Sequence, residues 1–238
     1  MGCDIHLFVE KKVDGKWVSA DSWEREEEEG FNSLSVDYNK RFYSGRNYDL
    51  FAILADVRNG SGFAGCDTGD GFVPIDSPRG IPEDASTEVK ECSERWDGDG
   101  HSHSWFTLAE LLAYDWTQTT KLRGMVNGPG FAEWDRYERH QRRGPKGYCG
   151  GVGGKGISHV SSDELEARVK GIIKDLTDKN QSDKIEETLL KETGAIFARV
   201  EWELAYHSTC AEFWSDTIPK LLKLGKQDEV RIVFFFDN

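Results

Sequence analysis

The strongest constraint on the fold of this 238-residue chain is an almost continuous apolar run at residues 230–236, Val-Arg-Ile-Val-Phe-Phe-Phe. Seven consecutive residues of this character indicate a strand that is buried on both faces. Only an interior strand of a sheet with structure on both sides meets that condition. The run therefore predicts the central strand of the sheet that organises the core.

The first ten residues, MGCDIHLFVE, alternate with the two-residue period of a β-strand. Asp4 and His6 fall on the same side of this strand, because side chains two positions apart share a face at roughly 6.5–7 Å. One metal ion or one substrate could therefore contact both. Asp14-Gly15 is a two-residue hairpin signal, so residues 3–13 should pair with residues 16–20. No targeting peptide precedes the first strand, which argues against secretion.

Residues 197–206 also alternate between apolar and polar side chains, as in a half-buried strand. Strands from both ends of the chain thus supply the core, which predicts a single α+β domain over residues 1–238. We expect a mainly antiparallel sheet built from the N- and C-terminal strands, with long Gly-rich loops and a polar helical insertion within 161–195. The helices expected to pack on this sheet are residues 48–58, 108–116 and 209–224.

Composition argues against several classes of protein. The formal net charge of −13 is unfavourable for direct nucleic-acid binding, which needs a basic surface. Part of the acidic excess lies in residues 24–29, which form either a solvated surface or an acidic face that docks on a basic partner. No apolar run approaches the ~20 residues of a membrane span. The five cysteines are odd in number and form no C-x-x-C pair, which fits reduced thiols in a cytoplasm.

Two of the six histidines lie close together in a polar segment, as His101-Ser102-His103. We expect a loop there, in which His101 and His103 share one face if the backbone is extended. Together with Asp4 and His6 they would supply oxygen and imidazole ligands, a set that suits a divalent transition metal such as Zn or Mn. The alternative is a polar cap whose histidines are satisfied by the backbone. The sequence assigns no catalytic residue.

The same two motifs resemble the D-x-H and G-H-x-H signatures of calcineurin-like metallophosphoesterases, which hold a two-metal centre. The G-D-x-x-D and G-N-H-[DE] motifs of that family are absent between them, and their separation is too short. We therefore exclude membership of that family. The chemical analogy that remains is the hydrolysis of phosphoesters with the help of a metal.

Three arginines, Arg46, Arg58 and Arg79, flank the loop-rich middle of the chain. A guanidinium group binds phosphate and carboxylate groups through two parallel hydrogen bonds, so these residues are candidate ligands for an anionic molecule. Salt bridges to the abundant Asp and Glu side chains are the alternative for each of them.

Five segments together carry a resemblance that covers nearly the whole chain. They are MGCDIH at 1–6, RNYDLF at 46–51, the PRG turn at 78–80 followed by PED at 82–84, HSHSW at 101–105 and VRIVFFFDN at 230–238. The chain resembles a family of hypothetical proteins encoded by tailed bacteriophages and prophages. The resemblance implies a phage origin and a cytoplasmic location in an infected bacterium, and it transfers no catalytic residue.

Three functions remain in competition, of which a virion or assembly component is the least favoured, because the sequence has no coiled-coil or β-helical repeats. The first is a metal-dependent hydrolase that acts on a small phosphate- or nucleotide-like molecule, with the metal at Asp4, His6, His101 and His103. The second is a non-enzymatic counter-defence protein that sequesters a signalling nucleotide or inhibits a host defence protein through its acidic surface. The sequence leaves open whether the protein is an enzyme and whether it forms a homo-oligomer.

Overall fold

The computed structural model describes residues 2–28, 31–96, 98–139 and 143–237, without the side chains of residues 26–28, 31 and 32. The chain divides into two compact units. Unit 1 comprises residues 1–59, 72–118 and 206–238, and unit 2 comprises residues 60–71 and 119–205. The single domain expected over residues 1–238 stays a prediction.

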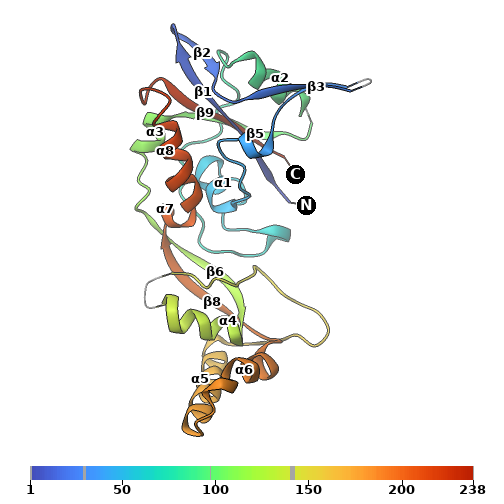
Figure 1. Ribbon diagram of the computed structural model, residues 1–238, viewed down its shortest axis with the longest axis vertical. Helices are drawn as coiled ribbons and strands as arrows, with labels where there is room; N and C mark the ends of the chain where they lie inside the picture. Colours follow the sequence, from blue (N-terminus) through green and yellow to red (C-terminus); the bar gives the residue numbers. More distant parts are fainter. Residues whose placement is uncertain (1, 29–30, 97, 140–142, 238) are drawn as a thin grey trace. The chain divides into compact units, whose positions relative to one another are not determined.

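Unit 1 is built on a four-stranded sheet in the order β2-β1-β9-β5 (Figure 1). The C-terminal strand β9 (Val230–Asp237) lies between β1 (Asp4–Val13) and β5 (His101–Thr107) and is antiparallel to both. Strand β2 (Lys16–Ser19) pairs with β1 through the Asp14-Gly15 turn, whose two residues have φ values of 50° and 79°. The predicted hairpin, the central position of β9 and the α+β class with its mainly antiparallel sheet are confirmed.

Each face of β9 is covered by a helix of unit 1. On one face Phe236 packs against Phe51 of α1 (Tyr48–Ala55), with 5.0 Å between the ring centroids. On the other face Phe235 belongs to a buried cluster with Val89 and Cys92 of α2 (Thr87–Arg95). Burial of each large apolar side chain stabilises the fold by roughly 1.5–3 kcal/mol. The two covered faces explain why β9 is apolar at nearly every position.

The structure corrects two strand predictions. Residues 101–107, expected to be a loop, form β5 and pair with β9. Strand β8 (Ile196–Ala205) does not join the sheet of β1 and β9, but lies in unit 2 between β6 (Thr119–Asn127) and β7 (Ser158–Val160). It is antiparallel to β6 and parallel to β7. The sequence pattern predicts no strand at residues 119–127, so it does not reveal β6 as the antiparallel partner of β8.

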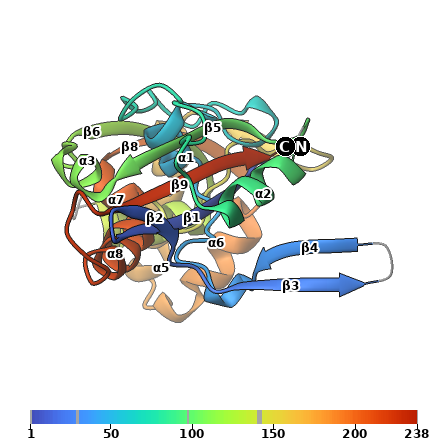
Figure 2. The ribbon, with the colours of Figure 1, turned by 90° about the horizontal axis from the view of Figure 1, so that it is seen from above.

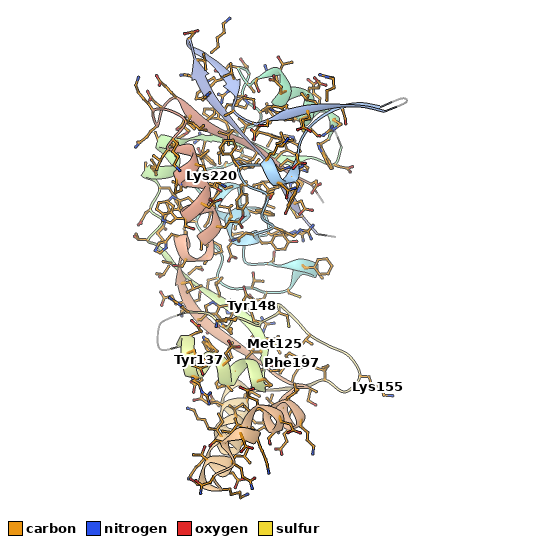
Figure 3. All side chains as sticks on the ribbon, viewed as in Figure 1. Met125, Tyr137, Tyr148, Lys155, Phe197 and Lys220 are labelled. Carbon is orange, nitrogen blue, oxygen red and sulfur yellow. The ribbon has the colours of Figure 1, made fainter. Side chains whose placement is uncertain are left out.

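Unit 2 also contains the helices predicted within residues 161–195. Gly128 lies against Thr193, because a Cβ at Gly128 would be 1.8 Å from Thr193 Oγ1. Tyr148, labelled in Figure 3, packs its ring edge-on against Trp202 of β8, with 4.8 Å between the ring centroids. The predicted helices are α5 (Ser162–Asp178) and α6 (Ile185–Thr193). Residues 124–160, expected to be loop-like, also contain the helix α4 (Gly128–Glu133) and the π-helical turn η3 (Trp134–Glu138).

Strands β3 (Trp23–Glu28) and β4 (Phe31–Val36) form a separate two-stranded sheet in unit 1, a hairpin that projects from β1 and β9 (Figure 2). The acidic run at residues 24–29 lies on β3 as far as Glu28, and Glu29 lies outside the described residues. Two of its charges are paired within unit 1: Glu24 with Lys40, and Arg25 with Glu91 of α2 at 3.2 Å.

The helix predicted at residues 209–224 is observed as α7 (Tyr206–Thr209) followed by a continuous helical run over residues 211–221, in which a π-helical turn leads directly into the last α-helical turn. Proline removes one helical hydrogen bond, and Pro219 directly follows the π-helical turn, where the regular α-helical bonding is interrupted. Another helix, α3 (Leu108–Ala113), begins with the capping box of Thr107 and Glu110. Among the described residues, no helix is long and apolar enough to cross a membrane. The short elements are η1 (Tyr38–Lys40), η2 (Phe63–Gly65), η5 (Ser182–Lys184), α7 (Tyr206–Thr209), η6 (Phe213–Thr217) and α8 (Ile218–Leu221).

Candidate functional site

One face of the sheet in unit 1 bears several charged and polar side chains of β1 and β9. Because β1 and β9 pair in register, their residues form a ladder in which polar pairs stand at both ends and an apolar pair between them. The α2 helix covers the middle of this face, around Phe8 and Phe235, whereas Asp4 at its open end is half exposed. From one end to the other, the cross-strand pairs are Asp4–Asp237, His6–Phe235, Phe8–Val233 and Glu10–Arg231.

His6 and Asp237 form a hydrogen-bonded pair at the open end of this ladder. His6 Nε2 lies 3.2 Å from Asp237 Oδ2, and Asp237 Oδ1 accepts a hydrogen bond of 3.1 Å from the backbone N–H of Asp4. A carboxylate only accepts, so Nε2 must carry the proton in neutral His6. Nδ1 is then left unprotonated, and it is the ring nitrogen that can accept a proton from another molecule.

The imidazole of His6 is held by two aromatic rings. It stacks on Phe235 with 4.7 Å between centroids and 13° between the planes, and Trp96 lies 4.4 Å away on a tilted plane. The His6 side chain is only 13% exposed. This burial lowers the pKa of His6 below its usual value, against the hydrogen bond with Asp237, which raises it. Burial therefore favours the neutral form of His6.

A cavity of about 570 Å³ opens beside this pair, within unit 1. Two guanidinium groups, those of Arg41 and Arg46, lie in its wall together with the carboxylates of Asp4 and Asp237. The cavity therefore combines anion-binding groups with an imidazole. The remaining lining residues are Ile5, His6, Tyr38 and Ser44.

The two arginines differ in how far they are engaged. Arg46 forms a bidentate ion pair with Asp4: its Nε donates to Oδ1 at 2.6 Å, and its Nη2 donates to Oδ2. This pairing lowers the pKa of the Asp4 carboxyl group. Arg41 donates from Nε to the carbonyl oxygen of Val36 at 3.2 Å and lies 5.6 Å from the ring centroid of Tyr38. Within the described part of the chain, its two Nη atoms have no hydrogen-bond partner.

His101 and His103 do not share one face, contrary to the prediction. His101 stacks near Phe236 at 6.0 Å, whereas His103 stacks on Phe235 at 4.9 Å, and consecutive residues of β9 point to opposite faces. The cause is a β-bulge between His101 and Ser104, where Ser102 has a φ of 51°. The extra residue reverses the alternation that the His-x-His spacing implies.

Each of the proposed metal ligands contacts other parts of the protein; these ligands are Asp4, His6, His101 and His103. Asp4 binds Arg46 and His6 binds Asp237, while the ring of Phe235 packs against both His6 and His103 from the two neighbouring strands. Across residues 2–28, 31–96, 98–139 and 143–237, no three His, Cys, Asp or Glu side chains are grouped so that they could hold a metal ion. Metal binding by these four residues stays a prediction.

Of the three arginines singled out by the sequence, Arg46 lines the cavity. Arg79 is engaged elsewhere, since it pairs with Asp76 at 3.0 Å and with Glu110 at 2.6 Å. Arg58 has a φ of 58° and lies 5.8 Å from the ring of Tyr48. Neither is among the residues that line the cavity.

Two residues central to the site escaped the sequence pattern. In the sequence, Asp237 is a polar residue that ends an apolar run, and Arg41 is one of many charged residues. A usable signal existed for Asp237: antiparallel pairing of the first and last strands places it opposite Asp4. No local pattern marks Arg41, which reaches the cavity from the segment after η1.

Comparison with known proteins adds no relative. No family model, no curated protein and no solved structure matches this chain. The function must therefore be argued from the site itself.

Proposed function

We propose that the cavity of unit 1 binds a small phosphate-containing molecule and that the His6–Asp237 pair acts on it as a general base. The observation that carries the proposal is an imidazole hydrogen-bonded to a carboxylate in a cavity that two arginines also line. A carboxylate that accepts from one ring nitrogen orients the imidazole and leaves the other nitrogen basic. This arrangement supports hydrolysis of a phosphoester, as the sequence also suggests.

In the proposed reaction, Arg41 and Arg46 bind the phosphate oxygens and balance the charge that builds on them. His6 Nδ1 takes a proton from the attacking water, and Asp237 stabilises the imidazolium that forms. The water oxygen bonds to phosphorus as the bond between phosphorus and the leaving oxygen breaks. The leaving oxygen takes the proton from the His6 imidazolium, which returns His6 to its neutral form. If Zn or Mn binds nearby, it would act as a Lewis acid on the same phosphate.

The resemblance to phage proteins supports a place for this activity in the cytoplasm of an infected bacterium. There a signalling nucleotide of the host is a ligand of the right chemical class. Binding without hydrolysis would make the protein a sequestering agent, the non-enzymatic alternative. The acidic β3–β4 hairpin is a separate candidate surface for a basic host protein.

The test measures both binding and turnover. Calorimetric titration with AMP and release of nitrophenol from bis-p-nitrophenyl phosphate are compared for wild type, His6→Gln and Arg41→Gln, each with EDTA and with added Zn or Mn. We expect His6→Gln to keep binding and to lose turnover by about 10²–10⁴-fold, and Arg41→Gln to weaken binding. Binding with no turnover in any buffer would favour sequestration, and absence of binding would reject the site.

A further inference from the structure

Arg46 already holds an anion in this structure, and the anion is part of the protein. Asp4 presents both carboxylate oxygens to the fork of the guanidinium group, with 2.6 Å between Arg46 Nε and Asp4 Oδ1. A phosphate group would use the same two donors in the same planar arrangement. A ligand that reaches Arg46 must therefore displace Asp4.

The pair is weak enough to open. The side chains of Arg46 and Asp4 are 55% and 50% exposed, and ion pairs at such positions contribute about 0.2–1 kcal/mol. Arg46 also lies against the backbone of Gly2, where a Cβ would be 3.0 Å from Nη1. Because residue 2 is a glycine, no side chain there occupies the space beside this guanidinium.

We propose, on the basis of the function proposed above, that Asp4 competes with the ligand for Arg46 and thereby selects a dianionic phosphate over a singly charged carboxylate. Exchange of one carboxylate for another gains nothing at Arg46. A phosphate monoester carries a charge of about −1.5 to −2 at pH 7 and three acceptor oxygens. It can therefore replace Asp4 at Arg46 and still reach Arg41.

The test titrates inorganic phosphate and acetate into wild type, Asp4→Asn, Arg46→Gln and a matched control, with calorimetry and with NMR of the Arg46 Nε–H group. The control is Asp216→Asn. Asp216 is 55% exposed and pairs with Lys220 of α8, which is labelled in Figure 3. Asp216 is not among the residues that line the cavity. It removes the same charge from the same unit.

We expect Asp4→Asn to bind phosphate about two- to fivefold more tightly than wild type, the gain that corresponds to releasing an exposed ion pair. Asp216→Asn should match wild type, Arg46→Gln should bind more weakly, and acetate should bind wild type more weakly than phosphate does. Phosphate should restore the slowly exchanging Arg46 Nε–H signal that Asp4→Asn loses.

Two results would overturn the inference in different ways. If phosphate binds wild type but Asp4→Asn binds it equally or less well, Asp4 is not a competitor and the proposed function stands. If phosphate binds neither wild type nor Asp4→Asn, the proposed function is wrong and the competition falls with it.

Discussion

Glu10 and Arg231 face each other on β1 and β9 and form an ion pair from which solvent is excluded. Arg231 Nε lies 2.7 Å from Glu10 Oε2, and the two side chains are 2% and 0% exposed. Ser86 donates its backbone N–H to the other oxygen of Glu10 at 2.6 Å, and Arg231 also reaches Asp84 at 2.8 Å. The guanidinium lies 4.1 Å from the ring centroid of Trp17.

Removal of one partner of this pair should be costly. Arg231→Met leaves Glu10 charged and buried without its partner, so we expect the free energy of unfolding to fall by about 3–5 kcal/mol. The measurement is urea denaturation. Lys226→Ala, which breaks the exposed Lys226–Glu229 pair, is the control and should change stability by less than about 1 kcal/mol. Equal effects of the two variants would contradict the importance given to the buried pair.

Asp21 should make stability depend on pH. Its Oδ2 accepts the backbone N–H of Val9 at 2.6 Å, its Oδ1 is buried without a partner among the described residues, and burial raises its pKa to about 7. The unfolded chain loses this proton near pH 4, whereas the folded chain keeps it until about pH 7. The cost to folding therefore grows over this interval and is complete above pH 7.

Asp21→Asn removes that cost, because a neutral amide can still accept from Val9. We expect the variant to be more stable than wild type at pH 8, by on the order of 1–3 kcal/mol, and similar to wild type at pH 4. Urea denaturation at both pH values measures this, with Asp216→Asn as a control that shows no such difference. A variant destabilised at both pH values would show that the carboxylate itself is needed.

His6 sets the expected acid limit of activity. Because burial lowers its pKa, the neutral form that accepts a proton persists below the usual value of about 6.5. Activity should therefore fall with a midpoint below pH 6.5. The free energy of unfolding should also fall as the pH is lowered. The unfolded chain protonates at the higher pH, so the stabilising contribution of His6 is lost as pH falls through 6.5 and below. His6→Gln should remove this part of the pH dependence of unfolding.

Asp237→Asn offers a sharper test of the pair. It removes the acceptor that raises the pKa of His6, and its amide can donate to Nε2 and so favour the wrong tautomer. Turnover should drop by about 10²–10⁴-fold while phosphate binding at Arg41 is retained. A midpoint of the pH profile that moves upward in this variant would contradict the assigned roles.

Two glycines of unit 2 should respond in opposite directions to the same substitution. Gly128→Ala places a Cβ 1.8 Å from Thr193 Oγ1, so α4 or α6 must shift, and we expect a loss of about 1–3 kcal/mol. Gly171→Ala meets nothing within 4 Å in the interior of α5, and should stabilise by about 0.5–1 kcal/mol. Thermal unfolding of the two variants distinguishes a packing requirement from a general intolerance to change.

Sequence patterns predicted the elements whose burial is simple. The apolar run of β9 and the alternation of β1 depend on local periodicity, and Asp14-Gly15 fixes its turn by backbone geometry alone. The sequence pattern predicts β8 in the sheet of β1 and β9, which is wrong, because alternation indicates a buried face and does not identify the partner strand.

The site was predictable in part, for a related reason. Asp4 and His6 do share a face, and Arg46 does reach it. His101 and His103 do not share one, since a single bulged residue, Ser102, reverses every later side chain of β5. Residue spacing fixes relative direction only while the strand stays regular, and a sequence gives no warning of a bulge held by a non-glycine residue.

The pairing of the first strand with the last also bears on how the protein folds. The hydrogen bond between Asp4 and Asp237 joins residues 233 positions apart, whereas β6 and β8 of unit 2 join a much shorter stretch of chain. Closing so long a loop is slow, so unit 2 is free to fold first. The two carboxylates of the cavity, Asp4 and Asp237, are brought together only when β1 and β9 pair. Ligand binding in refolding experiments should therefore develop with the slowest phase, and so report that the two ends of the chain have met.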